Sequence, residues 1–175
     1  MEQPILFTLI GPASDAVMLT IAEYCAEAKV QIKYLQHRQD LGFDCVMGQI
    51  NGTWNAMAKL EQKFQLFAKQ HELILDWQRV EAKQLDSNQI PYTVYITAAA
   101  KPDNFKKIWQ HFTDSGLVII DFVITENTAT LTRAVVHQFE LIILIPLDLS
   151  LSNLREEFLV FCDEQNFDAM LEPVR

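Results

Sequence analysis

The sequence has little positive charge. Its 175 residues include 14 Lys and Arg against 23 Asp and Glu, which gives a formal net charge of −9. Direct binding to nucleic acid depends on clustered Lys and Arg side chains that contact phosphates, and no basic stripe is present. We therefore expect no direct contact with nucleic acid, so that any effect on gene expression would act through another protein.

Cysteine and long apolar runs are also scarce. Cys25, Cys45 and Cys162 are widely separated and odd in number, so we expect buried, reduced thiols rather than disulfides. The most apolar run, residues 141–147, is far too short to cross a bilayer. No basic segment followed by an apolar one marks a secretory signal. These features predict a cytoplasmic protein that does not contact a membrane.

Motifs of catalysis are missing as well. The sequence contains no GxGxxG, Walker A or GxSxG motif. Its four histidines, His37, His71, His111 and His137, fall in four different predicted elements without the spacing of metal ligands. An acylphosphatase needs an Arg in the loop after the first strand, and residues 11–14 include no basic residue. We expect no enzymatic activity, no cofactor and no metal.

What is present is a repeat of one pattern, strand–helix–strand–strand–helix–strand. The apolar runs and turn residues predict eight strands, at residues 5–10, 31–39, 44–50, 73–80, 92–98, 117–125, 139–147 and 167–171. Four helices are predicted to begin at Ser14 or Asp15, at Thr53, at Pro102 or Asp103, and at Ser150 or Ser152. Asn51-Gly52 is expected to break the third strand, and the polar residues 126–137 exceed what a hairpin needs.

Apolar residues recur at helical spacing in each predicted helix, which indicates four buried stripes. They are Val17, Ile21, Tyr24, Cys25 and Ala28 in the first; Trp54, Met57, Leu60, Phe64 and Phe67 in the second; Phe105, Ile108, Trp109 and Phe112 in the third; and Leu154, Phe158, Phe161 and Cys162 in the fourth. Trp54 and Trp109 are therefore expected in the core.

The repeated pattern predicts an α+β protein built from two ferredoxin-like βαββαβ domains. Right-handed crossovers around a central hairpin give a four-stranded antiparallel sheet with both helices on one face. We place the domains at residues 1–82 and 91–175, with a polar linker at 83–90. The uncovered sheet faces and strand edges predict self-association into a homo-oligomer.

The stretch Gly52-Thr53-Trp54-Asn55-Ala56, at the start of the second predicted helix, resembles the ACT-domain regulators. In the family of glycine cleavage system transcriptional repressors, Gly-Ser-Trp-Asn-Ala occupies the corresponding place. The resemblance implies two ACT domains in tandem that bind a small amino acid such as glycine, often at an interface between units. It also implies regulation by contact with a DNA-binding transcriptional activator.

The resemblance further implies ligand-binding positions in each half. By position these are Gly11, Pro12, Ala13, Ser14, Asp15, Ala16, Val17, Gln31 and Ile32, and then Ala100, Lys101, Pro102, Asp103, Val118 and Ile119. The family's loop reads roughly Asp-Arg-Pro-Gly-Ile. Here Ala13, Asp15 and Ala16 stand at the positions of its acid, proline and glycine, and in residues 100–104 Pro102 matches while Ala100 replaces the acid and no glycine is present. Two functions therefore remain open: an amino-acid-responsive regulator, or an interaction module that no longer binds a ligand.

Overall fold

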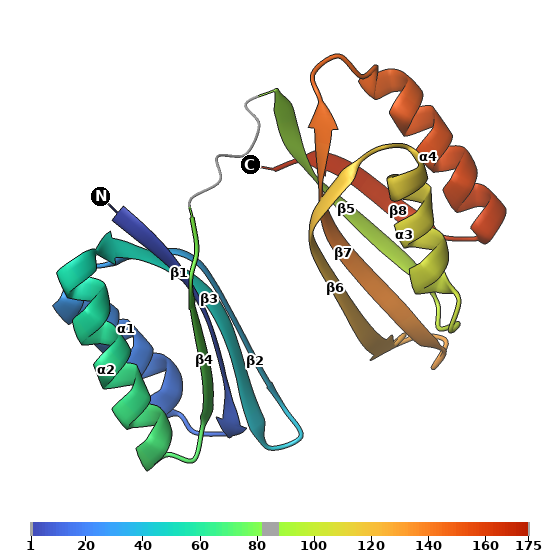
Figure 1. Ribbon diagram of the computed structural model, residues 1–175. Helices are drawn as coiled ribbons and strands as arrows, with labels where there is room; N and C mark the ends of the chain where they lie inside the picture. Colours follow the sequence, from blue (N-terminus) through green and yellow to red (C-terminus); the bar gives the residue numbers. More distant parts are fainter. Residues whose placement is uncertain (1, 82–87, 175) are drawn as a thin grey trace. The chain divides into compact units, whose positions relative to one another are not determined.

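The structure, a computed structural model, describes residues 2–81 and 88–174. These residues form two compact units, one on each side of residues 82–87 (Figure 1). The predicted linker, residues 83–90, lies mostly outside the described residues, and the first strand of the second unit already begins at Gln89. No helix in the described ranges is long and apolar enough to cross a membrane.

The first unit has the predicted order of elements. They are β1 (Glu2–Pro12), α1 (Ala16–Ala28), β2 (Gln31–Asp40), β3 (Phe43–Thr53), α2 (Trp54–Gln70) and β4 (Ile74–Arg79). The strands form an antiparallel sheet in the order β2-β3-β1-β4. Both helices cover the same face of this sheet (Figure 1).

The second unit repeats the arrangement. Its elements are β5 (Gln89–Ala99), α3 (Asn104–Asp114), β6 (Val118–Thr128), β7 (Val135–Pro146), α4 (Leu151–Gln165) and β8 (Asp168–Pro173). The sheet order is β6-β7-β5-β8, again antiparallel. Two ferredoxin-like βαββαβ domains therefore follow one another in the chain, as the sequence pattern predicts.

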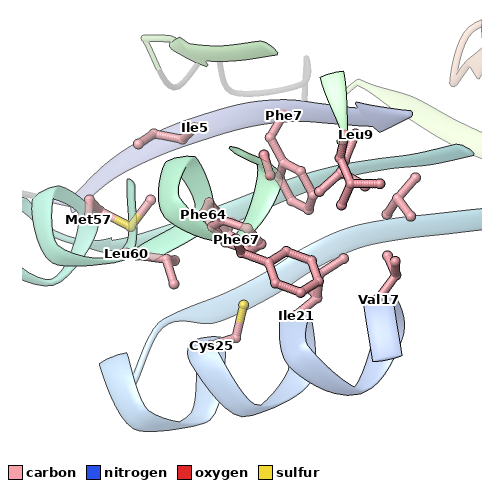
Figure 2. Close-up of a cluster of buried hydrophobic side chains, with 14 residues drawn as sticks. Ile5, Phe7, Leu9, Val17, Ile21, Cys25, Met57, Leu60, Phe64 and Phe67 are labelled. Carbon is pink, nitrogen blue, oxygen red and sulfur yellow. The ribbon is translucent and has the colours of Figure 1, made fainter. Parts of the chain in front are cut away.

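Each unit has its own hydrophobic core between sheet and helices. In the first, alternate residues of β1 (Ile5, Phe7, Leu9) meet the stripes of α1 and α2 (Figure 2). In the second, Val94 and Ile96 of β5 and Phe139 and Leu141 of β7 meet α3 and α4. Burial of one strand face and one helix stripe supplies the main driving force for folding.

The predicted helix starts are right in two cases and partly wrong in two. The hydroxyl oxygens of Thr53 and Ser150 each accept a hydrogen bond from the backbone N–H three residues on, at 3.4 Å. Asp15 and Asp103 occupy the N-cap positions of α1 and α3, but neither carboxylate caps its helix within the described residues. Ser14 helps α1 instead, because its Oγ accepts from the Ala16 N–H at 3.3 Å.

Several strands extend further than predicted. Asn51 and Gly52 do not break β3; they pair with Pro4 and Gln3 of β1, and β3 continues to Thr53. Half of the long polar segment 126–137 is also strand, since β6 runs to Thr128 and β7 begins at Val135. Backbone pairing with a neighbouring strand overrides local polarity in both places.

Four side chains expected to be buried are exposed, and one of them is Phe105 of α3, which is 46% exposed. Trp54 is 58% exposed because it is the first residue of α2, three residues before the first buried position, Met57. Trp109 is 38% exposed and lies beside the buried stripe of α3, against the ring of Phe122. Cys45 is exposed, because it alternates with the buried Asp44 and Val46 of β3 and so points to the opposite face of the sheet.

Candidate ligand-binding loops

The loop after β1 is held tightly against its own unit. Gly11, a buried residue at the end of β1, pairs with Asp44 of β3. A Cβ at position 11 would lie 2.4 Å from Leu73 Cδ2 and 3.0 Å from Leu73 Cα, so only glycine fits this close approach. The chain then leaves the strand, and Ala13 donates its N–H to Gly42 O at 2.9 Å.

Asp44 of β3 holds this loop in place through a hydrogen bond to its backbone. Its side chain is 1% exposed, and Oδ2 accepts the backbone N–H of Ser14 at 2.8 Å. Oδ1 lies 2.8 Å from His37 Nε2 and accepts a bond from Gln39 Nε2 at 3.2 Å. A buried carboxylate is tolerable only with such partners, so the three bonds account for its place in the core.

The hydrogen bonds also set the protonation of Asp44. Burial by itself raises the pKa of a carboxyl group, but here the bonds from His37, Ser14 and Gln39 and the charge on His37 outweigh it. They hold the pKa of Asp44 below its usual 3.8. The carboxylate is thus ionised at neutral pH and already engaged within the unit. It closes the loop rather than offering itself to a ligand.

Asp15 is the carboxylate that remains available in this loop. The sequence suggested that Asp15 would be engaged as a helix cap, and this is wrong, since its side chain makes no cap bond to α1 in the described structure. Pro12, Ala13, Asp15 and Ala16 are exposed, whereas Val17 is buried in the core. The exposed part of the loop could meet a ligand from outside the unit.

The candidate positions on β2 do not join this loop within the unit. Gln31 and Ile32 pair with Asn51 and Ile50 of β3, whereas the loop follows Gly11, which pairs with Asp44. At about 3.3 Å per residue the two places are roughly 20 Å apart along β3. The second unit repeats this separation, because Val118 and Ile119 pair with Leu144 and Ile143, while Ala99 pairs with Val136.

The loop after β5 is built differently. Ala100 donates its N–H to Val135 O at 3.1 Å, and Lys101, Pro102 and Asp103 are exposed. The Lys107 ammonium lies 2.8 Å from Asp103 Oδ2. The hydrogen bond from Lys107 is the main reason that the pKa of Asp103 lies below its usual 3.8.

Asn104, the first residue of α3, is the polar group buried beneath this loop. It is 1% exposed, and its Nδ2 donates to Ala99 O at 2.8 Å. Its Oδ1 is buried without a hydrogen-bond partner among the described residues. An unpaired buried carbonyl oxygen costs about 1–3 kcal/mol, so this atom is a natural acceptor for an N–H donor brought by a ligand.

Sequence reasoning did not select Asn104, although a signal was present. Positions 104, 108 and 112 form the buried stripe of α3, and Ile108 and Phe112 are apolar, as such a stripe requires. A polar residue at a buried position needs a hydrogen-bond partner, so Asn104 at the first of these positions indicates a specific contact. The four histidines, by contrast, form no metal-binding group with other ligating residues in the described ranges.

Comparisons with known proteins support the fold. A crystal structure provisionally described as a glycine cleavage system transcriptional repressor aligns over 100% of this chain and 99% of its own, with 16% identity and a TM-score of 0.69. An unidentified protein from Galdieria sulphuraria aligns over the full length of both chains, with 10% identity and a TM-score of 0.70. No protein-family model matches the chain, and no curated protein does.

These likenesses extend over both units in chain order. The tandem arrangement is therefore a shared architecture and not a chance likeness of one small domain. At identities of 16% and 10% the alignments show a shared fold, while the choice of ligand and partner depends on side chains that differ between the proteins.

Proposed function

We propose that the chain is a cytoplasmic regulatory protein that acts by contact with another protein, and that a small amino acid such as glycine modulates this contact. The observation that carries the proposal is the whole-chain likeness to the structure described as a glycine cleavage system transcriptional repressor. The partner would be a DNA-binding transcriptional activator. The net charge of −9 supports an effect on DNA through such a partner rather than by direct binding.

The loop of the second unit is the better place for the amino acid. The ammonium group of an amino acid would donate to the unpaired Oδ1 of Asn104. Its carboxylate would lie at the N-terminus of α3, where backbone N–H groups and the helix dipole favour an anion. Because the amide is buried, residues 100–103 would move aside as the ligand enters.

A second function, an interaction module without a ligand, is favoured by one observation in the first unit. There Asp44 satisfies the loop by itself, through the Ser14 N–H, and leaves no buried acceptor of its own for an amino acid. If the second unit behaves in the same way, the protein keeps only its surfaces for partner contact.

We propose a protein without catalytic activity. Burial raises the pKa of the Cys25 thiol, and burial together with the charge of Asp163 raises the pKa of Cys162 to about 12. Both groups are then protonated at neutral pH and unsuited to nucleophilic attack.

The test is a thermal-shift series with glycine, serine, alanine and the other small amino acids at millimolar concentration. A ligand at 100 times its dissociation constant adds about 2.7 kcal/mol to the unfolding free energy. For a chain of this size, that raises the melting temperature by several degrees, at about 2–4 °C per kcal/mol. A selective rise supports the regulator, and no rise with any amino acid favours the interaction module.

Replacement of Asn104 tests whether the amino acid that raises the melting temperature binds at this loop. Asn104→Leu continues the apolar stripe of α3 and removes the amide, so it is expected to abolish the thermal shift while the protein stays folded. Asn153→Leu, at an exposed position on α4, is the matched control and should leave the shift unchanged. A shift that survives Asn104→Leu would move the ligand away from this loop.

A further inference from the structure

A shallow open groove lies along α4 of the second unit, where His111 of α3 packs against it. It has a volume of about 500 Å³ and is lined by His111 of α3 and by Glu156, Glu157, Val160, Phe161 and Glu164 of α4. Both helices lie on the same face of their sheet (Figure 1). None of these residues belongs to the candidate ligand-binding loops.

The floor of the groove is apolar and aromatic. The His111 ring stacks on Phe161, with centroids 4.1 Å apart and planes at 11°. His111 Nε2 is buried and has no hydrogen-bond partner in the described part of the chain. Val160 is 58% exposed and adds an aliphatic surface. A surface of this kind can bind an apolar side chain, or a cation that lies over the face of an aromatic ring.

The rim of the groove is negatively charged and uncompensated. Glu156, Glu157 and Glu164 form no ion pair with any residue that the structure describes. The basic residue of α4 is Arg155, and it forms none with them either. The acidic rim, from Glu156 to Glu164, extends over nine residues of helix, a rise of about 12 Å. Carboxylates on one side of a helix repel one another, and a cation that binds between them relieves this repulsion.

The first unit carries positive charges on α2 that the second unit lacks at the corresponding positions of α4. A hollow between α1 and α2, nearer the start of α2, is lined by Glu27, Lys59 and Lys63 among others. Lys63 pairs with Glu27 and lies 4.9 Å from the ring centroid of Tyr24. When α2 and α4 are aligned on their N-caps, Thr53 and Ser150, Lys59 corresponds to Glu156 and Lys63 to Val160. The first unit supplies its own cations, and the second has none at these positions.

We propose that the groove along α4 is the docking surface for a basic, amphipathic segment of the partner protein. Its Arg or Lys side chains meet Glu156, Glu157 and Glu164, and an apolar side chain packs on Val160 and Phe161. A helix fits best, because an open groove along a helix, with a rim about two turns long, accepts a further helix by its side. The inference rests on the proposed function in one respect, namely that the protein acts by protein contact.

The test uses the full chain and a fluorescein-labelled amphipathic peptide of Arg, Leu and Ala as the probe, with binding followed by anisotropy at physiological salt. The variant Glu156→Gln/Glu157→Gln/Glu164→Gln is expected to bind the probe at least about tenfold more weakly, as the loss of three partly exposed ion pairs predicts. The matched control, Glu126→Gln/Glu140→Gln/Asp168→Asn, removes three charges from the strands of the same unit. It should change binding less than about twofold.

A charge exchange completes the test. The variant Glu156→Lys/Glu157→Lys/Glu164→Lys should bind a probe in which Glu replaces Arg, and should lose the original probe. If the groove variant and the control weaken binding equally, the attraction depends only on net charge and the proposal is overturned. Absence of binding by the wild-type protein would overturn it as well. Both results leave the response to amino acids untouched, so failure here is distinct from failure of the proposed function.

Discussion

At the scale of single residues, Asp44 links the fold to the loop after β1. Its buried carboxylate holds the Ser14 N–H, His37 and Gln39 at once. We expect Asp44→Asn to lower the unfolding free energy by about 2 kcal/mol, because hydrogen bonds to a charged group contribute about 1.5–3 kcal/mol. Urea unfolding measures this loss. Asp15→Asn, at an exposed position in the same loop, should change stability by less than about 0.5 kcal/mol.

His111 makes the second unit sensitive to pH. Burial lowers the pKa of His111 below its usual 6.5, although the carboxylates of Glu157 and Asp114 act in the opposite direction. The folded state then binds fewer protons than the unfolded state below pH 6.5. The contribution of His111 to stability is therefore complete above that pH and falls as pH decreases toward the folded pKa.

The variant His111→Phe keeps an aromatic ring against Phe161 and removes the titrating group. We expect it to flatten the fall in urea midpoint just below pH 6.5. Asp44 does not contribute there, since its lowered pKa places its loss of stability below pH 3.8. If the urea midpoint falls with the same slope in the variant and the wild type as pH decreases from 7, burial of His111 is not the cause of the loss of stability.

Cysteine reactivity follows burial. Cys45 is exposed on β3, while Cys25 and Cys162 are buried with raised pKa values. We expect one thiol per chain to react rapidly with an aromatic disulfide reagent in the folded protein, and three to react in denaturant. Cys45→Ser should remove the rapid phase. Rapid reaction of two or more thiols in native buffer would contradict the placement of the buried pair.

At the scale of elements, the hairpin between β2 and β3 carries a strained residue. Leu41 has φ of 50°, followed by Gly42 at 80°, which is the left-handed pair of a two-residue hairpin turn. A leucine in this conformation costs about 1–2 kcal/mol, and its side chain is 94% exposed. Leu41→Asn should therefore stabilise the protein by about 1 kcal/mol.

Thermal or urea unfolding checks this gain. Leu131→Asn is the matched control, since Leu131 is 97% exposed and has a negative φ. It should leave stability nearly unchanged. A loss of stability in Leu41→Asn would mean that the leucine side chain makes a contact that its exposure conceals.

The elements also show how far sequence reasoning reaches. Alternation in β1 and helical spacing in α1 give the fold class, the order of elements and most core residues, because these patterns reflect burial directly. The ends of β3 and β6 are missed, since pairing with a neighbouring strand decides them. Asn104 and Asp44 are missed as well, because a buried polar group is explained by its partners in space, which the sequence does not display.

At the scale of the whole molecule, the two units differ in charge. Residues 86–175 carry 13 acidic and 6 basic residues, against 10 and 8 in residues 1–85. A regulator that works by protein contact can use this difference to orient its partner. The charge also predicts no measurable affinity for duplex DNA at physiological salt, and a clear gel shift by the pure protein would contradict this.

The measurement that tests the central claim most directly is a backbone NMR titration of the labelled protein with glycine. We expect saturable shifts concentrated at residues 99–104, around the unpaired Oδ1 of Asn104, and no such shifts in Asn104→Leu. Shifts spread evenly over both units, or none up to millimolar glycine and the other small amino acids, would contradict an amino-acid-responsive regulator.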